Sequence, residues 1–92
     1  MNEVIKISKK TQVNKAAGAV AHFLRDGEKV YVTGTGRLGM MKALQTVTLA
    51  RRYVLEDGGF EINVRPDFMS VQYGEDTLKG IQFFVTACNI VD

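Results

Sequence analysis

A glycine-rich segment, residues 34–39, is the feature of the sequence that most constrains its fold. It has the pattern G-x-G-x-x-G, follows a strand-like run at residues 29–33, and precedes a helical pattern that begins near Leu38. Glycines at a strand-to-helix turn let the backbone approach an anion, and the free N–H groups at the start of a helix favour negative charge. The segment predicts an α/β fold with one of three roles for Gly34, Gly36 and Gly39: nucleotide binding, contact with a nucleic-acid backbone, or a purely structural tight turn.

The length of the chain bears on the nucleotide alternative. With 92 residues, the chain predicts a single domain over residues 1–92, whereas a dinucleotide fold of the Rossmann type needs two βαβαβ halves. Glu56 and Asp57 lie about twenty residues after the glycines, where a ribose-binding acid is expected. They fall, however, at the end of the long helical pattern and not at the end of the next strand. Nucleotide binding at Gly34–Gly39 is therefore the least favoured of the three alternatives.

Hydrophobic periodicity predicts six elements in the order β-α-β-α-β-β. The strands are expected at residues 4–8, 29–33, 60–71 and 81–87, and the helices at residues 13–24 and 38–55. Thr11 or Asn14 is the expected N-cap of the first helix, and Pro66 marks an edge, a bulge or a break in the third strand. Right-handed crossovers place both helices on one face. The predicted fold class is thus α/β, a two-layer sandwich with a four-stranded mixed sheet.

The net charge of +2 conceals an uneven distribution of charged residues. Through residue 52 the chain carries ten basic and three acidic residues, a balance of +7, and from residue 53 onward two basic and seven acidic residues give −5. Such asymmetry indicates a basic face for polyanions, unless the charges only coat a solvated surface. The apolar runs are too short to span a membrane, and the single cysteine forms no disulfide framework. A cytoplasmic protein that does not associate with membranes is expected.

Several segments of the chain resemble the stage V sporulation protein S family. The resemblance covers nearly the whole chain, from Val4 to about Val85, and includes many small residues. Its segments are residues 14–21, 24–25, 36, 42–54 and 66–68. That family is placed in the Alba-like group of small nucleic-acid-binding folds, whose element order is β-α-β-α-β-β. The resemblance implies an Alba-like domain and a regulatory role in bacterial sporulation or a related developmental programme.

Alba proteins themselves are similar in three places: Ser8-Lys9-Lys10, Gly36-Arg37, and the stretch from Lys42 towards Arg51. In Alba proteins the paired lysines and the Gly-Arg loop contact the nucleic-acid backbone, and the protein works as a dimer. A third contact there is a basic β-hairpin arm. The corresponding turn of this chain, residues 74–76, is acidic and departs from the pattern.

Basic and glycine residues near these loops are the predicted nucleic-acid contacts. They are Lys9, Lys10, Lys15, Gly36, Arg37, Lys42 and Arg52. The guanidinium of Arg37 is suited to hold a phosphate in a bidentate manner. We expect little sequence specificity, because no basic recognition helix is evident.

No catalytic or metal-binding constellation is evident in the sequence. His22 is expected to be an exposed polar residue, and Cys88 a buried small hydrophobe. Most aromatic residues are expected in the core. We therefore expect no catalytic residues, no metal and no cofactor. The prediction is a non-enzymatic DNA- or RNA-binding regulator that forms a homodimer or higher oligomer. The alternative is a protein-interaction module on the same fold, in which acidic Glu75 and Asp76 replace the binding arm.

Overall fold

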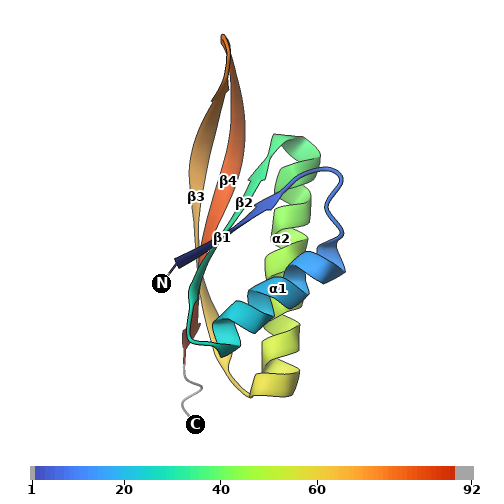
Figure 1. Cartoon of the computed structure of the whole chain (residues 1–92), viewed down its shortest axis with the longest axis vertical. Coiled ribbons are helices and arrows are strands. Elements are labelled where there is room, and N and C mark those ends of the chain that lie inside the picture. The colour runs from blue at the N-terminus through green and yellow to red at the C-terminus, as the bar shows by residue number, and fades with distance from the viewer. Residues whose placement is uncertain (1, 89–92) are drawn as a thin grey trace.

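The computed structural model describes residues 2–88, in which two helices cover one face of a sheet (Figure 1). The elements are β1 (Asn2–Ile7), α1 (Val13–Arg25), β2 (Lys29–Thr35), α2 (Gly36–Tyr53), the π-helical turn η1 (Val54–Gly58), β3 (Glu61–Tyr73) and β4 (Asp76–Cys88). The predicted order and the predicted two-layer α/β sandwich are confirmed. The π turn was not expected, and it absorbs the last residues of the predicted second helix.

The strands form one four-stranded mixed sheet in the order β1-β2-β4-β3. β1 pairs with β2 in parallel, and β4 runs antiparallel to both β2 and β3. β3 is therefore an edge strand, which explains how it accommodates Pro66, a residue that cannot donate a backbone hydrogen bond. Of the three alternatives for this proline, the edge position is confirmed. Because β1 and β2 pair in parallel, their ends bring the loops that follow them, and hence residues near 8 and 36, to the same edge of the sheet.

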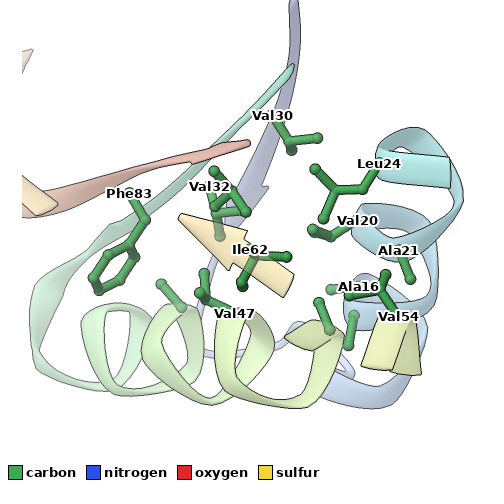
Figure 2. Close-up of a cluster of buried hydrophobic side chains, with 14 of the residues drawn as sticks. Ala16, Val20, Ala21, Leu24, Val30, Val32, Val47, Val54, Ile62 and Phe83 are labelled. Atoms are coloured by element: carbon green, nitrogen blue, oxygen red, sulfur yellow. The ribbon is translucent and has the colours of Figure 1, made fainter. Parts of the chain in front are cut away.

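Small apolar side chains fill the space between the sheet and the helices (Figure 2). Val30 and Val32 of β2 are completely buried, as are Val20 of α1 and Val85 of β4. Full burial of such a side chain contributes about 1.5–3 kcal/mol relative to leaving it exposed. The alanines of α1 add little bulk, so that helix can lie close to α2.

Four local expectations are corrected by the structure. Gln12, not Thr11 or Asn14, is the N-cap residue of α1, and it makes no side-chain cap bond; the hydroxyl of Thr11 instead accepts the backbone N–H of Ser8 at 2.9 Å. α2 begins at Gly36, two residues before the predicted start, because Gly36 itself enters the helix from a left-handed conformation. Cys88, expected to be buried, is exposed at the end of β4.

The fourth correction concerns the aromatic residues. Phe68 is 91% exposed and does not belong to the core. Phe68 belongs to the hairpin of β3 and β4, which extends beyond the helices (Figure 1). At the tip of that hairpin Gly74 has φ of 59°, the left-handed conformation that such a turn requires. The predicted acidic hairpin turn is therefore present, at the far end of the molecule.

Candidate nucleic-acid interface

A tight turn after β1 presents the paired lysines. The N–H of Thr11 donates to the carbonyl oxygen of Ser8 at 3.1 Å, and the N–H of Lys10 donates to the hydroxyl of Ser8 at 3.2 Å. These bonds make residues 8–11 a β-turn, with Lys9 and Lys10 at its two central positions. Both lysines are exposed. The turn therefore places two ammonium groups at the end of the sheet.

Lys42 holds this turn against α2. Its ammonium group donates to the carbonyl oxygen of Lys9 at 2.6 Å and to that of Thr11 at 3.0 Å. Two of its three donors are thus bonded to the backbone of the turn. The structure gives Lys42, one of the predicted nucleic-acid contacts, a positioning role.

The three glycines of the G-x-G-x-x-G segment have separate structural roles. A side chain at Gly34 would collide with the backbone carbonyl of Gly39 and come within 2.8 Å of the Ala43 methyl carbon. A side chain at Gly39 would lie 3.2 Å from the carbonyl oxygen of Ile7. Gly36, with φ of 73°, has open space around it and turns the chain into α2. Close packing and a left-handed turn account for all three glycines, so the geometry adds no support for a nucleotide site.

A hollow at the edge of the sheet brings together parts of the two loops. Its volume is about 340 Å³. We call it the basic cradle; its lining residues are Ser8, Lys9, Thr35, Gly36, Arg37, Leu38 and Gly39. The first turn of α2 has no acidic residue, and its N-cap Thr35 makes no side-chain cap bond. The free N–H groups of the helix start and the cations Lys9 and Arg37 therefore favour an anion here.

The other predicted contacts lie elsewhere or only beside the cradle. Lys10 is next to it in the same turn. Lys15 and Arg52 are exposed on α1 and α2, and Arg52 lines a different groove together with Val13. Ser8 and Thr35 were missed as lining residues. Ser8 directly precedes Lys9 in the sequence, and Thr35 directly precedes Gly36. This adjacency to two predicted contacts was the signal that could have identified them.

Two arginines near the C-terminal end of α2 form ion pairs with carboxylates of the protein. Arg51 donates to both carboxylate oxygens of Glu61 at 2.8 Å. This bidentate contact, aided by the N–H of Ile62, lowers the pKa of Glu61 to about 2. Arg25 pairs with Asp57 at 3.1 Å. These guanidinium groups are thereby engaged within the protein.

The order of strands, the two helices on one face and the paired loops at one edge of the sheet define an Alba-like domain. The fold matches that of Alba from Thermoplasma volcanium with a TM-score of 0.61, over 94% of this chain and 99% of that chain, at 16% sequence identity. At this level of identity the match establishes the fold alone.

The family is established by the sequence. The family model of stage V sporulation protein S (SpoVS) matches residues 3–88. The chain belongs to this family, which confirms the resemblance drawn from its residues. In the part that the structure describes, neither helix could span a membrane.

Proposed function

We propose that this protein is a non-enzymatic regulator of the sporulation family that binds the backbone of DNA or RNA through the basic cradle. The observation that supports the proposal most strongly is the meeting of Lys9 and Arg37 at the start of α2. Contacts to phosphates carry little sequence information, so the protein would bind many sequences with similar affinity. Its cytoplasmic location stays a prediction from the sequence.

The position of Arg37 is easier to understand with an anion in the cradle. A cation in the first turn of a helix opposes the helix dipole, and Arg37 is the second residue of α2. A phosphate between the guanidinium and the helix N–H groups would turn this repulsion into two favourable interactions. Each phosphate neutralised on duplex DNA adds about −0.9 to the slope of log affinity against log salt.

A cradle with two or three cations binds weakly alone, so we propose that the protein acts as a homodimer or higher oligomer. Two linked cradles would gain affinity through avidity. The exposed apolar side chains on the helix side of the sheet support this part of the proposal. They include Phe68 of the hairpin, and Met41 and Leu44 of α2, which are 50% and 56% exposed.

A second candidate function is that of a protein-interaction module. An apolar groove of about 450 Å³ runs between the start of α1 and the outer side of α2, lined by Val13, Leu44 and Leu49 among others. The acidic hairpin tip would repel a nucleic-acid backbone that approached that end. This candidate predicts no binding to nucleic acid even at low salt.

Fluorescence anisotropy with labelled duplex DNA, single-stranded DNA and RNA separates the two candidates. The proposal predicts binding at low salt that weakens as salt rises, and a large loss of affinity in the triple variant Lys9→Ala, Lys10→Ala, Arg37→Ala. The matched control is Lys15→Ala, Arg52→Ala, Lys79→Ala, which removes the same charge away from the cradle. Equal losses in both triple variants would contradict the cradle, and a wild-type protein that binds nothing would favour the interaction module.

A further inference from the structure

The face of the sheet that carries no helix exposes a pair of aromatic rings. Val30 and Val32 are buried on the helix side, so Tyr31 lies on the other side, which we call the open face. Tyr31 is the register partner of Phe84. Their ring centroids are 4.7 Å apart with an interplanar angle of 34°. Both side chains are only partly buried, so an aromatic surface remains accessible in the middle of the sheet.

The surroundings of this ring pair contain both charged and apolar side chains, among them the basic Lys6 and Arg65 and the exposed Val4, which is the register partner of Tyr31 on β1. Arg65, on the edge strand β3, is the register partner of Phe84 and is exposed. Thr33 lies two residues after Tyr31 on β2. It is the register partner of Gln82 on β4 and of Lys6 on β1. Asp67, the register partner of Gln82 on β3, adds an acidic side chain near these residues. A surface on which aromatic rings are interleaved with cations and hydrogen-bonding groups suits nucleobases and phosphates better than an apolar protein surface.

A hollow connects the open face to the basic cradle. It has a volume of about 210 Å³, and its lining includes Lys6, Thr33 and Tyr73 together with the apolar Met69 and Val71. Ser8 and Thr35 line both this hollow and the cradle. From Tyr31 to Thr35 the strand advances roughly 13 Å, at about 3.3 Å per residue. The ring pair at Tyr31, the hollow at Thr33 and the cradle at Thr35 therefore follow one another along β2.

We propose that the open face binds two or three bases of a single-stranded nucleic acid, stacked on Tyr31 and Phe84, while the adjoining phosphates lie in the basic cradle. The inference rests on the proposed function and assigns its substrate class. Bases in a duplex already have their faces covered by neighbouring bases, so only unpaired bases can stack on a protein ring. The planar guanidinium of Arg65 provides a further surface for stacking. A duplex would contact the cradle alone.

The test compares a 12-nucleotide oligo-dT or oligo-U with a DNA duplex of equal length, by fluorescence anisotropy on the full chain. The readout is the ratio of single-strand to duplex affinity. We expect Phe84→Leu and Tyr31→Leu each to lower single-strand affinity by about tenfold and to leave duplex affinity unchanged. Phe60→Leu, the same type of change at an aromatic that packs against the core on the helix side, is the matched control and should leave the ratio unchanged. The two single strands show whether the 2′-hydroxyl matters.

Each outcome separates this inference from the proposed function. An unchanged ratio in both ring variants overturns the inference, while duplex binding that depends on Arg37 still supports the cradle. Absence of all binding by the wild-type protein overturns both. If a ring variant fails to fold, ultraviolet cross-linking of the wild-type protein to 4-thiouridine-containing RNA decides instead. Cross-links localised by mass spectrometry to Tyr31 or Phe84 support the inference, and cross-links confined to the turn of residues 8–11 overturn it.

Discussion

Replacement of Gly34 by alanine tests whether the glycine-rich segment is built for packing. The added methyl would collide with the carbonyl of Gly39 and lie 2.8 Å from the methyl carbon of Ala43. The Gly39 carbonyl and the Ala43 methyl group both belong to α2 and cannot rotate away. The clash can therefore be removed only if the whole helix moves away from β2. Overpacking of this kind lowers the free energy of unfolding by about 1–3 kcal/mol. Alanine also reduces the conformational entropy of the unfolded chain, which raises the free energy of unfolding by about 0.4–1 kcal/mol.

We therefore expect a net loss of about 1.3 kcal/mol from the free energy of unfolding. For a domain of this size the loss corresponds to a melting temperature lower by roughly 5–10 °C, measurable by circular dichroism. Gly18 in α1 provides the matched control, because a side chain there meets nothing within 4 Å. Gly18→Ala should raise the stability by about 0.5–1 kcal/mol. If Gly34→Ala melted at or above the wild-type temperature, the packing explanation for this glycine would be refuted.

Three further predictions concern single side chains. Lys42→Met should lower the free energy of unfolding by about 1–2 kcal/mol, because it removes the donor to the carbonyl oxygens of Lys9 and Thr11; an unchanged denaturant midpoint would argue against the positioning role. Glu61 has its pKa lowered to about 2 from 4.5 by Arg51, so its stabilising effect is complete above pH 4.5 and disappears as the pH falls through 2. Glu61→Gln should therefore melt below the wild type at pH 7, and the difference should shrink as the pH is lowered from 4.5 towards 2; a difference of the same size at pH 2 as at pH 7 would contradict this explanation. Phe68→Ser should weaken self-association by roughly 30-fold, seen as a lower mass in light scattering, whereas an unchanged mass would exclude Phe68 from the oligomer contact.

Much of the fold followed from local patterns in the sequence. The alternation of Val30 and Val32, and the small residues at three- and four-residue steps in α1, identified the elements and the faces they bury. The position of the third strand at the edge agrees with Pro66. The exact helix boundaries did not follow, because they depend on φ at Gly36 and on the Ser8–Thr11 bonds, which are set by the surrounding turn.

The candidate site was predicted less completely than the fold. Lys9 and Arg37 were placed together correctly, since parallel strands end at the same edge of a sheet. The sequence could not show that the ammonium of Lys42 is engaged by two carbonyls, because a lysine in a helix has the same pattern in either role. It also could not show that Tyr31 and Phe84 meet, since their contact depends on the register between β2 and β4.

Salt dependence of duplex binding tests the central claim most directly, namely that Lys9 and Arg37 hold phosphates in one cradle. The measurement is the slope of log affinity against log salt for the wild-type protein and for Arg37→Ala. Loss of one phosphate contact should make the slope shallower by about 0.9 for each cradle that contacts the duplex. An Arg37→Ala variant with the wild-type slope and affinity would contradict the claim.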